Sequence, residues 1–135
     1  MALIKAREVV DAIMAHLDAG STTNYLSQGP KRPSGKYCVV HPFTPEDDGS
    51  LGDPAQNSIV QFQTTSVGET SEQALWVQDT VAARLHLAVL TVATGVTTHP
   101  IRAVKGSAQP VLRDDDIEPP MFYATKRWRV HAIPE

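Results

Sequence analysis

The residues best suited to bind a metal or carry a proton are scattered along this chain. Zinc sites need three or four converging ligands, usually at short fixed spacings. No two histidines stand four residues apart, and with one cysteine no Cys-x-x-Cys pair exists. The pattern favours ordinary surface or boundary histidines, namely His16, His41, His86, His99 and His131.

The acidic residues form no recognisable cation site either. Residues 44–56 hold several acids, but the Asp, Asp/Asn, Gly and closing Glu order of a calcium loop is missing. Asp114, Asp115 and Asp116 are consecutive, so in an extended segment their carboxylates alternate in direction. We interpret both groups as solvated turns, and a partner-facing or lumen-lining role for the second group is the alternative.

Motifs for nucleophilic or phosphate chemistry are also missing from the sequence. No Gly-x-Ser-x-Gly surrounds a serine, and neither a Gly-x-x-x-x-Gly-Lys-Ser/Thr loop nor a dinucleotide-binding glycine pattern occurs. Cys38 stands beside Val39 and Val40, which indicates a small core residue rather than a nucleophile. We therefore expect neither an enzyme nor a cofactor.

One segment combines basic and aromatic residues, at Lys126, Arg127, Trp128 and Arg129. Such a cluster could clamp and stack on a nucleic acid strand. In a strand, however, Trp128 points to one face while Arg127 and Arg129 point to the other. This alternation favours an exposed sheet face or an ion-pairing contact with another subunit. The formal net charge of −3 also argues against a protein that coats nucleic acid.

Hydrophobic periodicity predicts an N-terminal helix at residues 3–19, because apolar residues recur there every three or four positions. Gly20 stands where a left-handed C-terminal cap is expected. Residues 21–36, which include Lys31 and Arg32, lose all periodicity, so we predict a long exposed loop.

Strands are expected at 37–43 and 57–67, on either side of a second long loop at 44–56. A second helix should start near Thr70, because Thr70 and Gln73 have the spacing of a capping box.

Besides its buried stripe, this second helix carries another apolar flank that includes Trp76, which indicates a further contact surface. Residues 87–94 either continue the helix or start a strand. Residues 95–100 turn the chain. The remaining expected elements are short strands at 101–105 and 110–113 and a long last strand at 121–132.

The order helix, strand, strand, helix, strands lacks strict βαβ alternation. It predicts an α+β fold: a mostly antiparallel sheet of four to five strands with two helices packed on one face. The length of 135 residues suits a single domain, 1–135. The N-terminus lacks the order of a signal peptide, and the apolar-leaning run 87–96 is too short for a membrane span. We expect a protein kept in the cytoplasm unless it is packaged into a particle.

Three segments carry a family resemblance: the opening helix at 6–12, the strand-to-helix join at 65–76 (TSVGETSEQALW), and 112–123 leading to 127–130. They resemble phage tail terminator proteins, especially those of long-tailed phages that infect actinobacteria. Length and element order match as well, so the resemblance covers nearly the whole chain. It does not extend to any pattern in the long loops, and its motifs are not catalytic signatures.

The resemblance implies a small sheet flanked by helices that needs no cofactor and forms a ring, commonly a hexamer, on the last ring of the tail tube. Such a ring stops tube polymerisation at the length set by the tape measure protein and docks the head-side connector. The implied partners are copies of itself, the tail tube protein and that connector, with the tape measure protein as a further candidate. DNA would pass through without specific binding. The implied location is the neck end of the virion tail, after assembly in the host cytoplasm.

Candidate contact residues lie on the non-core row of the last strand, the second flank of the second helix, the acidic turn and the first long loop. The main alternative is a head–tail connector or head-completion protein of the virion neck. A nucleic-acid-binding module and a small hydrolase, two other classes, rank below it. The candidate contact residues are Tyr123, Arg127, Arg129, Trp76, Asp114, Asp115, Asp116, Lys31 and Arg32.

Overall fold

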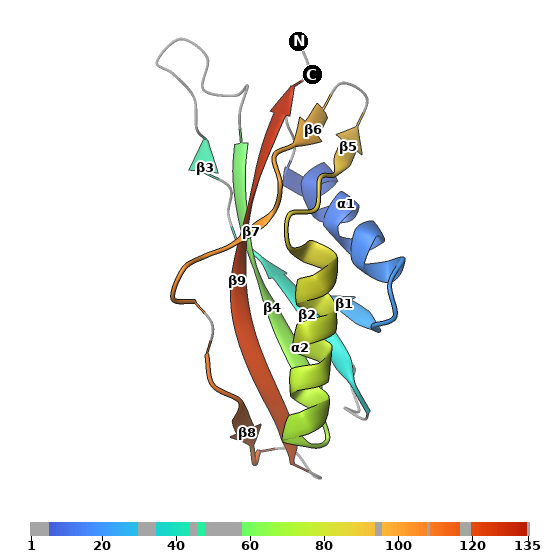
Figure 1. The fold of residues 1–135 in the computed structure, drawn as a ribbon, viewed down its shortest axis with the longest axis vertical. Helices are drawn as coiled ribbons and strands as arrows, with labels where there is room; N and C mark the ends of the chain where they lie inside the picture. Colours follow the sequence, from blue (N-terminus) through green and yellow to red (C-terminus); the bar gives the residue numbers. More distant parts are fainter. Residues whose placement is uncertain are drawn as a thin grey trace.

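Two helices and a nine-stranded sheet make up the described part of the chain, so the protein is α+β as predicted (Figure 1). The computed structural model describes residues 6–29, 35–43, 46–47, 58–93, 96–107, 109–116 and 120–134. The helices are α1 (Ala6–Asp18) and α2 (Ser71–Leu85). The strands are β1 (Asn24–Leu26), β2 (Tyr37–Pro42), β3 (Glu46–Asp47), β4 (Ser58–Gly68), β5 (Thr91–Ala93), β6 (Val96–Thr98), β7 (Arg102–Ala103), β8 (Leu112–Asp114) and β9 (Met121–Pro134).

The sheet is built around the long antiparallel pair of β4 and β9, which stay in register from Ser58 opposite Ala132 to Gly68 opposite Phe122. The strand order is β1-β2-β4-β9-β6-β5, with β3 beside β4, and with β7 and β8 beside β9. The pair of β1 and β2 is parallel, so the sheet is mixed rather than purely antiparallel. The expected four to five strands were too few, because strands of two or three residues are too short to show a period-two pattern.

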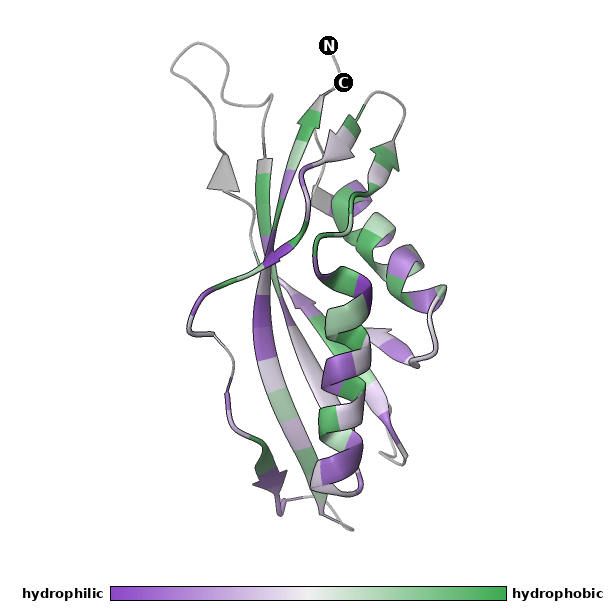
Figure 2. Ribbon diagram, viewed as in Figure 1, coloured by the Kyte–Doolittle hydropathy of each residue, from purple (hydrophilic) through white to green (hydrophobic). Residues whose placement is uncertain are grey.

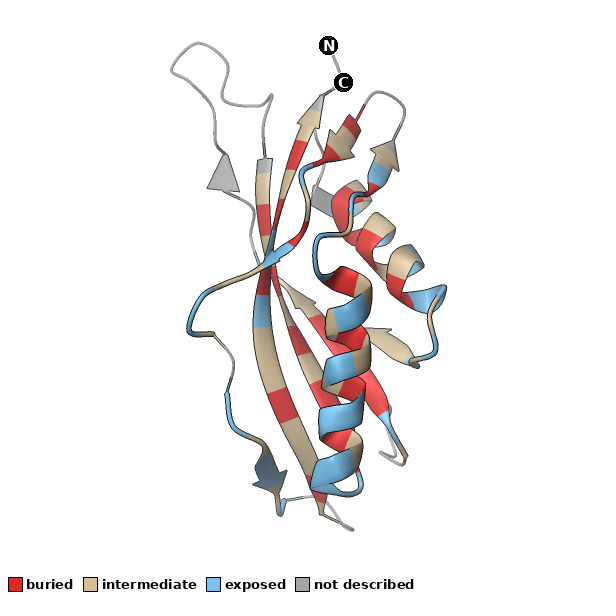
Figure 3. Cartoon of the chain, in the orientation of Figure 1, coloured by how far each residue is buried: buried red, intermediate tan, exposed pale blue. Residues whose placement is uncertain are grey.

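Both helices pack against the same face of the sheet and enclose the larger core. Alternate residues of β9 point into it, and Trp128, Val130 and Ala132 are fully buried there with Phe62 of β4. The helices contribute side chains such as Ile13 to the same core. Figure 3 shows the result: buried residues line the sides of α1 and α2 that meet the sheet, and exposed residues line the outer side of α2.

The start of α2 follows the predicted capping pattern. The Thr70 side chain accepts a hydrogen bond from the Gln73 backbone N–H at 3.2 Å. The Gln73 Oε1 accepts one from the Glu69 N–H at 2.8 Å, one residue before the cap. The first contact satisfies a donor that a helix start leaves without a partner, and the second fixes the residue that precedes the cap.

The end of α2 decides the question left open for residues 87–94, because the described part, 87–93, does not continue the helix. Leu87 has a left-handed φ of 59°, and its N–H donates to the Ile101 carbonyl at 2.8 Å. Ile101 in turn donates to the Ala88 carbonyl at 2.9 Å. This exchange turns the chain, and residues 91–93 then form strand β5.

Three expectations for the connecting segments were wrong. Residues 21–36 are not entirely loop, because β1 pairs with β2. Residues 44–56 contain the short strand β3, and 95–100, expected to be a turn, contain β6. These strands are held by backbone hydrogen bonds to longer neighbours, which sequence periodicity does not reveal.

Gly20 is not the left-handed cap that was predicted. Positive φ among the described residues occurs at Ser27, Gly35, Leu87 and Gly106 instead. The Gly20 N–H donates to the Leu17 carbonyl at 2.9 Å, and a Cβ at this position would lie 3.1 Å from the Arg84 Cδ. Glycine therefore serves close packing there rather than backbone conformation.

Candidate interaction surface

The face of the sheet opposite the helices carries an exposed group of cations. Arg127 and Arg129 are exposed there, opposite Gln63 and Gln61 of β4, while Trp128 between them is buried in the helix-side core. The predicted alternation along β9 is thus confirmed. It follows from the period of two, which sends successive side chains to opposite faces.

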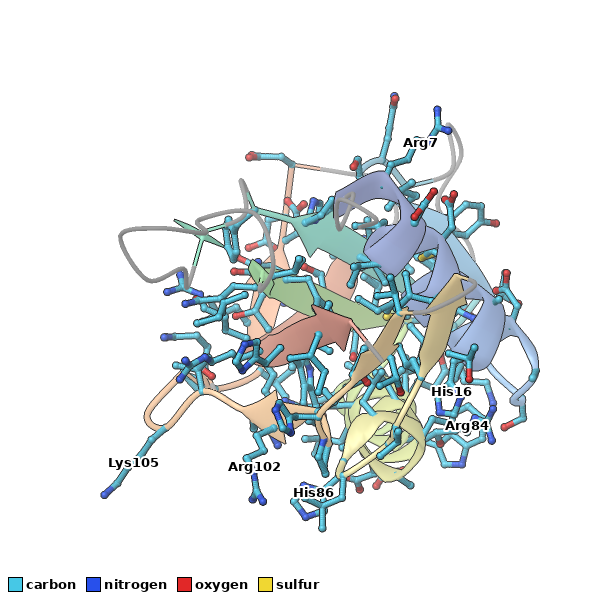
Figure 4. All side chains as sticks on the ribbon, turned by 90° about the horizontal axis from the view of Figure 1, so that it is seen from above. Arg7, His16, Arg84, His86, Arg102 and Lys105 are labelled. Carbon is cyan, nitrogen blue, oxygen red and sulfur yellow. The ribbon has the colours of Figure 1, made fainter. Side chains whose placement is uncertain are left out.

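Two further cations join this group from the segment that runs along the other edge of β9. Arg102 of β7 pairs with Arg129 in register, and Lys105 follows shortly after. Both side chains are exposed and project outward (Figure 4). We call Arg102, Lys105, Arg127 and Arg129 together the basic face.

Three members of the basic face, Arg102, Lys105 and Arg129, line a hollow of about 400 Å³. His99 and His131 also line this hollow, with their ring centroids 5.0 Å apart. A second hollow of about 270 Å³ shares Val104 and Lys105 with it and extends the surface to Arg127. The two together form a recessed strip. The full lining of the first hollow is Gln61, His99, Pro100, Arg102, Ala103, Val104, Lys105, Arg129 and His131.

The charges of the basic face are not neutralised by carboxylates of the described residues. The ion pair found in this part of the chain joins Arg113 and Asp115 at 2.7 Å, both strongly exposed. Arg127 instead lies with its guanidinium carbon 4.9 Å from the centre of the Phe43 ring. A cation over an aromatic face keeps its charge available to a further partner.

Next to the basic face, on the same side of the sheet, lies a small apolar cluster. Tyr37, Val39, Val67 and Met121 are buried in it, and Tyr123 packs against it. They line a hollow of about 280 Å³ together with residues such as Asp114. The pKa of Tyr37 is raised, chiefly by burial and also by the neighbouring Tyr25 and Asp114. The hydroxyl group at this hollow is therefore held in its neutral form.

A second candidate surface lies on the opposite side of the protein, on the outer face of α2. Leu75 and Trp76 are adjacent there and are 45% and 44% exposed. Glu72 and Asp79 are exposed on the same side, because residues three, four and seven apart share one face of a helix. We call these four residues the α2 outer face. Figure 2 shows the alternation of hydrophilic and hydrophobic colours along it.

The remaining predicted contact residues lie apart from both surfaces. Asp114 ends β8, and its Oδ1 accepts a hydrogen bond from the Asp116 N–H at 3.0 Å. Asp115 and Asp116 are exposed. Lys31 and Arg32 lie outside the described residues.

Sequence reasoning missed three members of this arrangement. Arg102 and Lys105 lie in a segment without clear periodicity, and only the pairing of β7 with β9 brings them to Arg129. Phe43 follows β2, and its N–H donates to the Gln61 carbonyl of β4 at 2.9 Å. This bond holds the Phe43 ring beside Arg127. No local signal marks these contacts, because they depend on strand register.

Two further observations concern metal binding and nucleophilic chemistry in the described residues. No three or more His, Cys, Asp and Glu side chains of this part of the chain converge on a possible metal position. Cys38 is fully buried, and desolvation raises its pKa to about 12, so the thiolate that a nucleophile needs is disfavoured. Neither α1 nor α2 is long and apolar enough to cross a membrane.

Comparison with models of known protein families gives no match for this chain, and comparison with curated proteins gives none either.

Proposed function

We propose that this chain is a structural subunit of a phage tail, of the tail terminator type. It forms a ring, expected to be a hexamer, on the end of the tail tube, stops tube polymerisation and provides the docking surface for the head-side connector. The ring would sit at the neck end of the virion tail, with DNA passing through it.

The observation that carries this proposal is the uncovered face of β9. Arg127 and Arg129 are exposed on it while Trp128 between them is buried, so the strand supports the core with one side and presents cations with the other. Arginine, tyrosine and tryptophan are enriched among the residues that dominate protein–protein binding. The exposed Trp76 on α2 supports the same interpretation.

The sheet also has edges that a ring would cover. β1 and β5 are the terminal strands of the main strand order, and each pairs with a neighbour on one side. Unpaired strand edges are prone to join other chains, and closed symmetric assembly removes them. The sheet edges do not by themselves specify which assembly forms. The choice of a ring on a tail tube rests on the sequence resemblance to tail terminators.

The closest alternative is a head–tail connector or head-completion protein of the same virion neck. The two differ in what the ring binds. Purified protein should be mixed with assembled tail tubes and, separately, with capsid portals, and inspected by electron microscopy. Caps on tube ends support the terminator. Binding to portals alone supports the connector, and binding to neither contradicts both.

A second candidate function, nucleic-acid binding, is favoured by the basic face alone. Arg102, Lys105, Arg127 and Arg129 form a recessed cationic strip of the kind that could contact phosphates. It predicts duplex or single-stranded DNA affinity that falls steeply with salt and drops in Arg127→Ala and Arg129→Ala. The net charge of −3 disfavours it.

A further inference from the structure

We propose that the basic face of one copy of the chain binds the α2 outer face of the next copy, so that subunits join head to tail. This inference rests on the proposed ring and names the two surfaces that build it. The partner of the basic face is thus a second copy of the chain rather than a nucleic acid.

Charge complementarity is the first argument. Glu72 and Asp79 are seven residues apart, two helical turns, so both carboxylates project from the same side of α2. Glu69, just before the helix, is exposed as well. The basic face presents cations with no carboxylate of the described residues within ion-pair distance. The carboxylates of one surface and the cations of the other are therefore complementary.

Apolar content is the second argument. Trp76 and Leu75 stand exposed between the two carboxylates of the α2 outer face. On the other side of the protein, the Phe43 ring lies beneath Arg127 and is 39% exposed. Each surface thus presents an exposed aromatic ring, and aromatic residues and arginine are enriched at protein–protein interfaces. A phosphate backbone would use the cations but would leave these rings and the carboxylates without a role.

The placement of the two surfaces is the third argument. Both helices pack on the side of the sheet that buries Trp128 (Figure 1). Arg127 and Arg129 alternate to the other side of β9, so they and the α2 outer face lie on opposite sides of the sheet. A contact between two different surfaces repeats from subunit to subunit, and it closes into a ring when the rotation allows. A contact of the basic face with itself would bring like charges together.

Lys36 adds a detail on the α2 side. Its ammonium group lies 4.1 Å from the centre of the Trp76 ring, so this surface carries a cation beside its carboxylates. It covers the Trp76 ring in the single chain, so docking of a neighbour must share or displace it. Replacing Lys36 with methionine should leave the contact intact or strengthen it.

The test uses two variants that each carry one reversed surface. Variant A is Arg127→Glu with Arg129→Glu, and variant B is Glu72→Lys with Asp79→Lys. All four residues are exposed, so both variants should keep the wild-type thermal unfolding temperature within a few degrees. Self-association of the purified chain, without any phage component, is measured by sedimentation velocity up to millimolar protein.

We expect the wild type to associate, and A and B alone to associate at least about tenfold more weakly, because like charges then face each other. An equimolar mixture of A and B should regain wild-type association, since the reversed faces of A and B complement each other. A single chain with all four reversals should regain it too.

Several outcomes would overturn the inference. Variant B associating as the wild type does would show that the α2 outer face is not used. A mixture of A and B that stays monomeric would show that the two faces do not bind each other. A wild type that is monomeric even at millimolar protein would show that the contact does not form. Loss of duplex DNA binding in A, with self-association unchanged, would assign the basic face to nucleic acid.

This experiment is independent of the test of the proposed function. If the chain self-associates through these surfaces but does not bind tail tubes, the inferred contact is supported and the terminator function is refuted. If the chain caps tubes but A and B self-associate as the wild type does, the terminator function is supported and the inferred contact is refuted.

Discussion

The indole nitrogen of Trp128 and the hydroxyl oxygen of Thr64 are joined by a buried hydrogen bond of 3.0 Å between β9 and β4. Trp128 is among the largest fully buried side chains, and Thr64 is nearly inaccessible. Thr64 can also donate to the Lys126 carbonyl, at 3.4 Å. A polar group in the core is thus satisfied across the same two strands that carry Arg127 and Arg129 on their other face.

Replacing Thr64 with valine should therefore destabilise the fold. Valine matches the shape of threonine but leaves the Trp128 N–H buried without an acceptor, which costs about 1–3 kcal/mol. Thr64→Ser is the matched control, because it keeps the hydroxyl. Urea unfolding of both variants measures the difference. Because serine also loses a buried methyl group, a valine variant as stable as the wild type is the result that would show that the hydrogen bond contributes nothing.

Arg84 and His16 tie the two helices together through their backbones. The Arg84 Nη2 donates to the His16 carbonyl at 2.6 Å, and the His16 Nε2 donates to the Arg84 carbonyl at 2.7 Å (Figure 4). Arg84→Met removes the charged donor and should lower the free energy of unfolding by about 1.5–3 kcal/mol. The control is Arg102→Met, an exposed arginine whose loss should change it by less than about 0.5 kcal/mol. Equal losses in the two variants would refute the role given to Arg84.

Gly68, the last residue of β4, is needed for close packing at the start of α2. A Cβ at this position would lie 2.5 Å from the Gln73 Cβ and 2.7 Å from the Ala74 nitrogen. Gly68→Ala should therefore cost about 1–3 kcal/mol through overpacking. At Gly29 the nearest atom would be 3.5 Å away, so Gly29→Ala should be close to neutral. Thermal unfolding of the two alanine variants distinguishes them, and a tolerated Gly68→Ala would contradict the packing argument.

Cys38 should be unreactive in the folded protein. Burial raises its pKa from 9.0 to about 12, so the folded state holds the thiol proton that the unfolded chain releases from about pH 9. Stability should therefore fall as pH rises from about 9 toward 12, because the unfolded state binds fewer protons there.

The difference in unfolding free energy between the wild type and Cys38→Ala isolates this contribution from other groups. It should shrink or reverse between pH 8 and pH 10, and a thiol reagent at pH 8 should label Cys38 only after unfolding. Rapid labelling of the native protein would place this thiol at the surface.

The long elements could be predicted from the sequence because their periodicity is strong. α2 begins at the predicted cap, and β9 alternates as predicted between Trp128 in the core and Arg127 at the surface. Of the short strands, β7 and β8 overlap the strands expected at 101–105 and 110–113. β1, β3 and β6 were not predicted, because two or three residues are too few to show a period-two pattern. The same limit applies to the basic face. The exposure of Arg127 and Arg129 could be predicted from the alternation along one strand, but Arg102 and Lys105 lie beside them only because β7 pairs with β9. Lys31 and Arg32 lie outside the described residues and stay predictions.

The central claim is that this chain caps a tail tube through exposed protein surfaces. The most direct measurement is the length of tubes growing from the cognate tail tube protein, followed by electron microscopy as the chain is added. The proposal predicts that elongation stops once each tube end carries one ring, while folded Arg127→Glu/Arg129→Glu protein leaves elongation unchanged. Tubes that keep growing at saturating wild-type protein, with no density at their ends, would contradict it.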